Sequence, residues 1–376
     1  MQPTNILIRG VNWLGDAVMT TPAIARLRER FPASRLSLLT PHDLADLWRH
    51  HPDLDEVVPF QSGDSPWRIG RRLRNQGYDC ALVFPNSPRS ALEVFLAGIP
   101  RRIGYRRPWR HLFLTEPVAP RPAEVPMRKR STAEIQRLIS LPHSTSPSEV
   151  PTQAHHLHQY LHLAGVLGAD TTPCEPRLRV TEDESTLFRG KWLNTSPAPP
   201  HWLGLNPGAA YGPAKRWPED RFVETATRAH KNTGCGCLIT GGPGEKALAE
   251  SIASALTRAG VSPVVNLAGQ TSLRQLCVAL KACHALLTND SGPMHLAAAL
   301  ETPVVAVFGS TSPDLTGPGR PDAPGPHVLL RHPTPCAPCF LRDCPIDLRC
   351  LHGVTPDNAL DALLGVLRPR SGGTHL

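Results

Sequence analysis

The chain has 376 residues, of which 40% are hydrophobic. This length and apolar content exclude a disordered chain and favour two domains, each with its own core. No stretch approaches the roughly 18 apolar residues of a membrane-spanning helix, and the N-terminus does not resemble a signal peptide, so we expect a cytosolic protein with no transmembrane segment. The ten cysteines would then be reduced thiols or metal ligands.

The net charge of +8 is unevenly distributed along the chain. Residues 1–130 hold 20 Lys or Arg and 12 Asp or Glu, whereas residues 131–376 hold 20 of each. Nearly all the basic residues of the first part are arginines, whose planar fork binds phosphate and carboxylate. The excess indicates either a solvated basic face or an N-terminal domain that receives an anionic partner.

Apolar strand patterns alternate with amphipathic helix patterns in the first part of the chain. The predicted strands are 5–9, 35–40, 56–59, 78–84 and 102–105. The predicted helices are 16–31, one from residue 43, 67–76 and 90–97. Residues 117–152, rich in Pro, Ser and Arg, predict a mobile loop with a short helix over 133–141, followed by a helix with Leu157, Leu161, Ala164 and Leu167 on one face.

A second alternating series follows residues 183–200, which are typical of a linker. Its predicted strands are 202–206, 237–240, 263–267, 284–288 and 303–308, and its predicted helices are 218–231, 245–259, 272–282, 292–300 and 357–367. We therefore predict an α/β protein with two Rossmann-like, doubly wound domains, 1–185 and 201–354. A C-terminal helix and tail over 355–376 is a candidate to pack back on the N-terminal domain. Ligands of such sheets bind beyond the carboxyl ends of the strands, so a cleft between the domains is the expected site.

The segment 286–296, with sequence LLTNDSGPMHL, predicts a strand, a polar turn and a helix with Pro293 in its first turn. Free backbone N–H groups of Ser291, Gly292 and Met294 would suit an anion such as a diphosphate. Asp290 would repel phosphate and suits sugar hydroxyls. The alternative is that Asp290 is only the N-cap of the helix.

Two further turns join a strand to a helix. The first, 206–218, contains the adjacent cations Lys215 and Arg216, which would neutralise a leaving diphosphate, or else form a surface pair. The second, around Gly241 to Glu245, is glycine-rich and would let a nucleotide approach the backbone, although glycine loops alone are a weak signal.

Asp16 stands at the head of the first predicted helix, directly after the turn at Gly15. A carboxylate at that position could take a proton from an acceptor hydroxyl, acting as a general base. The alternative is again helix capping.

A cysteine cluster lies near the C-terminus. Its members are Cys336, Cys339, Cys344 and Cys350, flanked by His332 and His352. The spacing resembles that of metal ligands, so these residues are candidates for a structural zinc or another metal, or else they are reduced thiols or a local pair.

Taken together, these motifs resemble the heptosyltransferases of glycosyltransferase family 9. The resemblance covers about residues 5–365 and rests on four segments: 6–16 (ILIRG and WLGD), 207–218 (PGAAYGPAKRWP), 289–295 (NDSGPMH) and 304–311 (VVAVFGST). It implies a GT-B fold whose two domains face a central cleft, an inverting mechanism, and no cofactor or metal in catalysis.

The resemblance also implies roles for individual residues. Asp16 would be the general base, Lys215 would hold the donor phosphates and Asp290 would hold the heptose. The remaining donor contacts would be Ser291, Gly292, His295 and, near the adenine, Thr271. The implied reaction moves L-glycero-D-manno-heptose from ADP-heptose onto the heptose of a lipid A–Kdo–heptose acceptor at the inner leaflet of the inner membrane. Transfer onto another inner-core sugar is the alternative within the family.

Two kinds of rival are a different enzyme and a non-catalytic binding protein. Among enzymes, a sugar-nucleotide epimerase would need no acceptor. A nicotinamide oxidoreductase would need Gly-x-Gly-x-x-Gly after the first strand, and residues 10–15, GVNWLG, do not fit that pattern. A non-catalytic protein that binds lipopolysaccharide or nucleic acid would use the basic N-terminal part. No recognisable nucleic-acid module surrounds Tyr105 and Trp109, so we expect no nucleic-acid partner.

Overall fold

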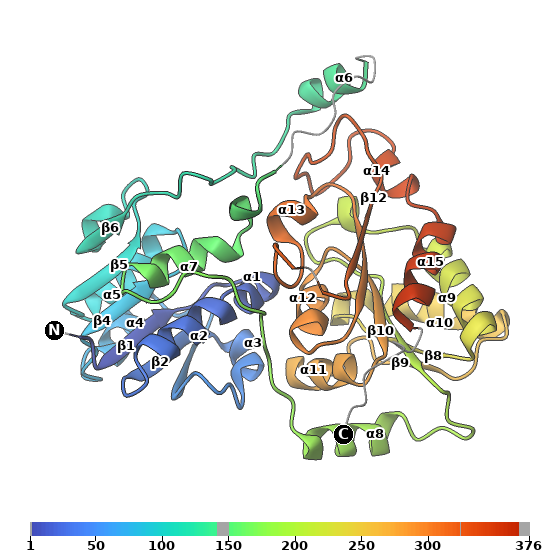
Figure 1. Ribbon diagram of the computed structural model, residues 1–376, viewed down its shortest axis with the longest axis horizontal. Coiled ribbons are helices and arrows are strands. Elements are labelled where there is room, and N and C mark those ends of the chain that lie inside the picture. Colours follow the sequence, from blue (N-terminus) through green and yellow to red (C-terminus); the bar gives the residue numbers. More distant parts are fainter. Residues whose placement is uncertain (1, 141–149, 324, 368–376) are drawn as a thin grey trace. The chain divides into compact units, whose positions relative to one another are not determined.

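The computed structural model describes residues 2–140, 150–323 and 325–367, which form two compact units. Unit 1 consists of Met1–Val125 and Pro151–Arg179, and unit 2 consists of Pro126–Val150 and Val180–Leu376. Each unit contains a six-stranded sheet in which all neighbouring strands are parallel (Figure 1). The prediction of two doubly wound α/β domains is therefore confirmed.

The sheet of unit 1 has the strand order β3-β2-β1-β4-β5-β6. Its strands are β1 (Asn5–Arg9), β2 (Arg35–Pro41), β3 (Glu56–Phe60), β4 (Cys80–Val83), β5 (Arg101–Tyr105) and β6 (Glu116–Val118). The central strand β1 aligns Ile8 with Leu38 on one side and with Leu82 on the other. All three side chains are fully buried, as expected for a parallel sheet that is covered on both faces.

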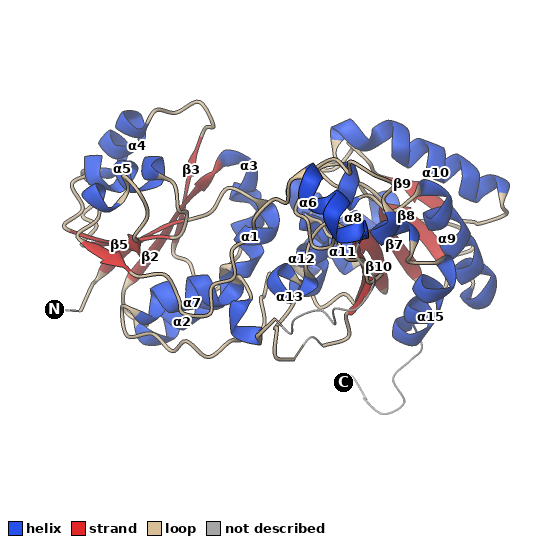
Figure 2. Cartoon of the chain, turned by 90° about the horizontal axis from the view of Figure 1, so that it is seen from above, coloured by secondary structure: helices blue, strands red, loops and turns tan. Residues whose placement is uncertain are grey.

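Helices cover both faces of this sheet. They are α1 (Leu14–Met19), α2 (Thr21–Arg30), α3 (His42–Ala45), α4 (Pro66–Leu73), α5 (Pro88–Leu96) and α7 (Leu157–Gly165), with short 3-10 turns η1 (Asp46–Trp48), η2 (His111–Phe113) and η3 (Thr152–Ala154). Figure 2 shows α4 and α5 on one face and α2 and α7 on the other. Gly70 lets α4 approach α5 closely, because a Cβ there would lie 2.6 Å from the Cβ of Leu96.

The sheet of unit 2 repeats the same topology with the order β12-β11-β10-β7-β8-β9. Its strands are β7 (Trp202–Asn206), β8 (Gly236–Ile239), β9 (Val264–Asn266), β10 (Ala285–Asn289), β11 (Val304–Phe308) and β12 (Val328–Arg331). The strands β11, β10 and β7 are buried along their whole length. They are adjacent and parallel, so the loops that follow them meet at one edge of the sheet.

Unit 2 has the larger set of helices. They are α6 (Thr132–Ser140), α8 (Glu182–Trp192), α9 (Glu219–Thr233), α10 (Lys246–Arg258), α11 (Leu273–Lys281), α12 (Gly292–Ala299), α13 (Pro313–Thr316), α14 (Arg349–His352) and α15 (Pro356–Leu367), with the 3-10 turns η4 (Pro213–Lys215) and η5 (Pro243–Glu245). Helix α15 lies beside α9 (Figure 1) and contributes Ala359 and Leu363 to the core of unit 2. The tail 368–376, predicted with this helix, lies outside the described residues.

The single helix predicted over 16–31 is wrong, because the structure has two helices separated at Thr20. Pro22 lacks a backbone N–H and cannot continue the hydrogen-bond ladder of α1. The hydroxyl of Thr21 donates to the carbonyl of Val18 at 2.8 Å and so satisfies the acceptor that Pro22 leaves.

The linker predicted over 183–200 is wrong in its first half, where α8 forms. Thr181 and Glu184 make a reciprocal capping box at the start of this helix. The carboxylate of Glu184 also accepts two hydrogen bonds from Arg274 on α11, at 2.7 and 2.6 Å.

The described residues contain no helix with the length and apolar character that a bilayer crossing needs.

Residues 126–140 belong to unit 2 although the chain enters them from unit 1. The backbone N–H of Arg130 donates to the carbonyl of Cys339 at 3.0 Å. Ile135, which is 1% exposed, packs in a cluster with Cys336 and Cys339. These contacts attach the segment before α6, and α6 itself, to the C-terminal part of the chain.

Candidate active site

Lys215 and Asp290 form an ion pair at the carboxyl edge of the sheet of unit 2. The Lys215 Nζ lies 2.6 Å from the Asp290 Oδ2, and the two side chains are 15% and 5% exposed. The hydroxyl of Thr311 donates to the same carboxylate oxygen at 2.5 Å. Lys215 follows β7, Asp290 follows β10 and Thr311 follows β11, so the strand order brings three distant segments together.

Two buried asparagines hold this edge in place. Asn289 donates to the carbonyl of Pro207 at 2.7 Å and accepts from the backbone N–H of Trp217 at 2.9 Å. Asn206 donates to the hydroxyl of Ser291 at 3.4 Å. The sequence alone indicated no role for either residue. Their signal was an amide at the last position of a buried strand, where it can join two loops.

Helix α12 begins directly beyond the ion pair. Its N-cap is Ser291, in an extended conformation, and the helix starts at Gly292. The Ser291 hydroxyl lies 3.1 Å from that of Thr288, and it caps no amide of the described helix. The first-turn N–H groups of a helix have no partner within the helix and attract anions. Asp290 is therefore not the N-cap. His295 lies about one turn into α12 and is 5% exposed.

The predicted nucleotide turns also come together at this edge. The carboxylate of Glu245 accepts from the backbone N–H of Gly242 at 2.8 Å and lies against Gly208, where a Cβ would be 1.8 Å from its Oε1. The backbone N–H of Gly269 donates to the carbonyl of Gly241 at 2.9 Å. Thr271, half-buried, lies two residues beyond Gly269. The loops after β7, β8 and β9 are thus connected around these positions.

The adjacent cations predicted as a pair point to different partners. Lys215 binds Asp290, whereas the guanidinium of Arg216 donates to the carbonyl of Ala209 at 3.3 Å. The Lys215 ammonium lies 5.0 Å from the centroid of the Tyr211 ring, and the Arg342 guanidinium lies 5.2 Å from it. These contacts leave Lys215 as the cation beside the start of α12 and give Arg216 a structural role in the loop.

Asp16 lies in unit 1, in the first turn of α1. The N-cap of this helix is Trp13, so the structure gives Asp16 no capping position. Its carboxylate is 28% exposed and lies 3.6 Å from the Nδ1 of His156. Burial, and then the charge of Asp16, raise the pKa of Tyr160 well above its usual value. Asp16 is therefore an accessible carboxylate beside a histidine and a protonated phenol that the sequence analysis did not include.

A basic hollow of about 550 Å³ lies at the carboxyl edge of the sheet of unit 1, beyond the ends of β2 and β3. Asp16, which follows β1, lies at this edge too. It is lined by His42, Pro59, Gln61, Asp64, Arg68, Ile69, Arg71 and Arg72. The three arginines are exposed, whereas the single acid, Asp64, is 7% exposed. Arg68 lies 3.2 Å from the carboxylate of Asp64. Beside this ion pair the hollow presents Arg71 and Arg72 to an incoming ligand, so it suits an anion.

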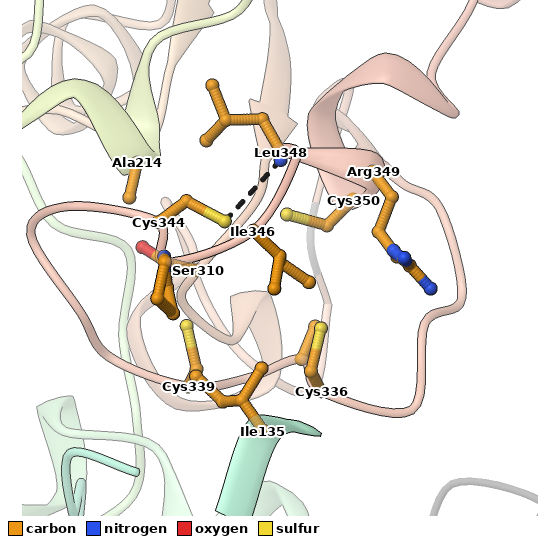
Figure 3. Close-up of a pocket in the computed structure, with 12 residues that line it drawn as sticks. Ile135, Ala214, Ser310, Cys336, Cys339, Cys344, Ile346, Leu348, Arg349 and Cys350 are labelled. Atoms are coloured by element: carbon orange, nitrogen blue, oxygen red, sulfur yellow. Dashed lines mark hydrogen bonds between the residues drawn. The ribbon is translucent and has the colours of Figure 1, made fainter. Parts of the chain in front are cut away.

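The four predicted metal ligands converge on one small cavity of unit 2, of about 20 Å³ (Figure 3). Cys336, Cys339 and Cys350 are buried, and the sulfur of Cys344 accepts from the backbone N–H of Leu348 at 3.4 Å. Burial, and the neighbouring thiols, raise the pKa of Cys350 to about 12. Within the described residues, no group of three or more Cys, His, Asp or Glu side chains has the arrangement of a metal site. The metal prediction is therefore without support, and the structure shows four free thiols.

The chain is similar to known proteins over most of its length. The family model described as glycosyltransferase family 9 (heptosyltransferase) matches residues 66–349. Lipopolysaccharide heptosyltransferase 2 of Salmonella typhimurium is 33% identical over 319 residues, which cover 83% of this chain and 85% of that protein. The protein of the same name from Escherichia coli K12 has the same identity and coverage.

Solved structures show the same relationship. The structure of E. coli ADP-heptose lps heptosyltransferase II has a TM-score of 0.75 and 28% identity, and the match covers 98% of each chain. A glycosyl transferase family 9 structure from Veillonella parvula has a TM-score of 0.74 at 20% identity and covers 97% of each chain, which shows a shared fold.

Proposed function

Since the chain belongs to glycosyltransferase family 9, the heptosyltransferases, we propose that it is a lipopolysaccharide heptosyltransferase II. In this reaction L-glycero-D-manno-heptose moves from ADP-heptose to the heptose of a lipid A–Kdo–heptose acceptor. The observation that carries the proposal is the Lys215–Asp290 pair beside the start of α12. It combines a cation, free helix amides and a carboxylate, which are the groups that a sugar diphosphate needs.

The donor diphosphate lies at the start of α12 in this proposal. Ser291, Gly292 and His295 line its site, while Gly241, Glu245 and Thr271 border the nucleotide. Lys215 exchanges its bond with Asp290 for one with the diphosphate and neutralises the charge that develops as ADP leaves. Asp290 is then able to accept hydrogen bonds from the heptose hydroxyls. The described contacts support this placement of the two groups because they lie side by side directly before the start of α12.

Asp16 is the general base of the proposed transfer. It removes the proton from an acceptor heptose hydroxyl as that oxygen attacks the anomeric carbon from the face opposite ADP. The new C–O bond forms while the bond between the anomeric carbon and the diphosphate oxygen breaks, so the configuration inverts. The accessibility of the carboxylate supports this role. The proposed reaction needs no cofactor.

The basic hollow is the proposed subsite for the anionic part of the acceptor. Arg68, Arg71 and Arg72 would bind its phosphates and acidic sugars. The hollow and Asp16 follow strands of the same parallel sheet, so they lie at one edge of unit 1. Because this acceptor carries a lipid, the proposed place of work is the cytoplasmic side of the inner membrane.

The test is Asp16→Asn. This variant should bind ADP-heptose as the wild type does, measured by calorimetry, and should transfer heptose at least about 100-fold more slowly, measured by mass spectrometry of the acceptor. Asp46→Asn, a change of a partly exposed carboxylate on η1, is the control and should be active. Transfer by Asp16→Asn near the wild-type rate would remove Asp16 from the mechanism. Defined acceptors truncated at successive inner-core sugars would separate this activity from transfer onto another sugar.

A further inference from the structure

The basic excess of the chain is confined to a short part of unit 1. Residues 65–115 contain ten arginines, no lysine and two acids, Asp79 and Glu93. Glu93 is fully buried and paired with Arg9 and Arg89. Asp79 accepts hydrogen bonds from the backbone and hydroxyl of Thr4. The net charge of this segment equals the +8 of the whole chain. Arg110 is buried, and Arg68, Arg101 and Arg107 pair with acids just outside the segment. The positive excess is therefore carried by the remaining arginines, which include Arg102 and Arg106 near the exposed apolar side chains.

The same segment exposes large apolar side chains. Trp109 is 76% exposed, Trp67 68%, Leu112 64% and Phe95 44%. Exposed apolar side chains that gather among polar neighbours mark interaction surfaces. Trp109 also has a φ of 62°, in the left-handed region that bulky residues rarely adopt. The loop therefore holds this tryptophan outward at a conformational cost.

The loop that carries Trp109 and Leu112 is fixed to the core. Arg110 is fully buried, and its guanidinium donates to the carbonyl of Val83 at 2.9 Å and to that of Tyr105. These bonds attach the loop to the carboxyl ends of β4 and β5. The exposed side chains on either side of Arg110 are thus presented by a rigid support and do not need to be ordered on binding.

Helix α5 extends this support. The rings of Phe95 and Phe113 pack at 5.6 Å between centroids. Arg102 donates to the carbonyl of Phe113 at 2.8 Å and lies over the ring of Phe95, 5.4 Å from its centroid. The turn η2, which carries Leu112, packs on α5, so apolar and cationic groups lie close together here. We call it the aromatic–arginine surface and define it by Phe95, Arg102, Arg106, Trp109, Leu112 and Phe113.

We propose that the aromatic–arginine surface docks the enzyme on an anionic lipid bilayer. Tryptophan side chains settle at the interface between head groups and acyl chains, and arginines beside them attract anionic lipids. Leu112 and Phe95 would enter the outer part of the acyl region, as on other proteins that lie on a membrane without crossing it. The proposal rests on the proposed function only in that a lipid-linked acceptor requires such docking.

The charge and the apolar groups together favour a bilayer over other partners. A nucleic acid would use the arginines and stack on aromatic rings, but it would leave Leu112 exposed to water. An anionic bilayer offers a negative plane and an apolar layer beneath it, which match the two kinds of side chain. Competition by RNA becomes one outcome of the test.

The experiment measures co-sedimentation of the full chain with vesicles of phosphatidylethanolamine, with and without phosphatidylglycerol. The wild type should bind the vesicles that contain phosphatidylglycerol. The double variant Trp109→Ala, Leu112→Ala should bind at least about tenfold more weakly, because it removes two apolar side chains that the bilayer would bury. Leu187→Ala, a change of a 75% exposed residue on α8 of unit 2, is the matched control and should bind as the wild type does.

Three results would overturn the proposal: equal binding to vesicles without phosphatidylglycerol, unchanged binding by the double variant, or displacement from the vesicles by short single-stranded RNA. Circular dichroism checks that the double variant is folded, and Arg102→Gln with Arg106→Gln tests the charge separately. Transfer to a water-soluble acceptor without lipid should be unchanged in the double variant. If the wild type transfers no heptose but binds vesicles as expected, the proposed function fails and the docking surface remains.

Discussion

Replacement of Lys215 by methionine tests the pair on which the proposed donor site depends. At 2.6 Å and an effective dielectric constant of about 20, the attraction between the two charges is about 6 kcal/mol before desolvation is subtracted. Lys215→Met leaves the carboxylate of Asp290 almost completely buried without its cation. We expect a loss of about 3–5 kcal/mol in the free energy of unfolding, because an uncompensated buried charge is costly.

The double variant Lys215→Met, Asp290→Asn removes both charges and should recover most of this loss. Urea unfolding followed by circular dichroism should give a coupling free energy of about 2 kcal/mol or more between the two positions. Heptose transfer should be lost in both the single and the double variant, because neither retains the cation that is proposed to bind the diphosphate. Additive losses of stability would show that the pair does not interact in solution. Transfer at the wild-type rate by either variant would refute the proposed donor site.

Three further predictions concern stability and the nucleotide loops. Hydrogen bonds from Arg274 lower the pKa of Glu184 to about 2, so this carboxylate should contribute a loss of stability as the pH falls from about 4.5 to 2. Glu184→Gln should reduce the pH dependence of urea unfolding over this range and cost about 1–2 kcal/mol at pH 7. Burial lowers the pKa of His51 to about 4, so His51 should contribute a loss of stability as the pH decreases from about 6.5 to 4, and His51→Gln should make that loss smaller in thermal unfolding. At Gly208 a Cβ would lie 1.8 Å from the carboxylate on η5, so Gly208→Ala should weaken ADP binding about tenfold by calorimetry, whereas Gly244→Ala, with no atom within 4 Å of its added Cβ, should bind ADP normally.

The central strands were predictable because their apolar runs are local signals. The strands β1, β7 and β10 begin and end within a residue of their expected bounds. The edge strands β6 and β12 were missed, because three or four half-buried residues give no such run. The break between α1 and α2 depends on a single proline and the threonine beside it, which the apolar periodicity does not register.

The sequence indicated individual residues of the site but not which of them contact one another. Lys215 and Asp290 each stood out in a turn between a strand and a helix, but their ion pair follows from the order of strands in the sheet. Thr311 was part of the recognised segment without a role, although it donates to the same carboxylate. His156 lies 140 positions from Asp16 in the sequence, and only the packing of α7 on the sheet brings the two together.

The path of the chain between the two units determines how the protein can be dissected. The chain leaves unit 1 after Val125, contributes α6 to unit 2, returns at Pro151 and leaves again after Arg179. A fragment that ends at Arg179 would therefore carry α6 without the cysteine-lined surface on which Ile135 packs, and a fragment that begins at Val180 would lack that side chain. Neither piece is a complete folding unit. The two fragments, expressed separately, should expose apolar surface and aggregate unless α6 is moved by circular permutation or supplied as a separate peptide.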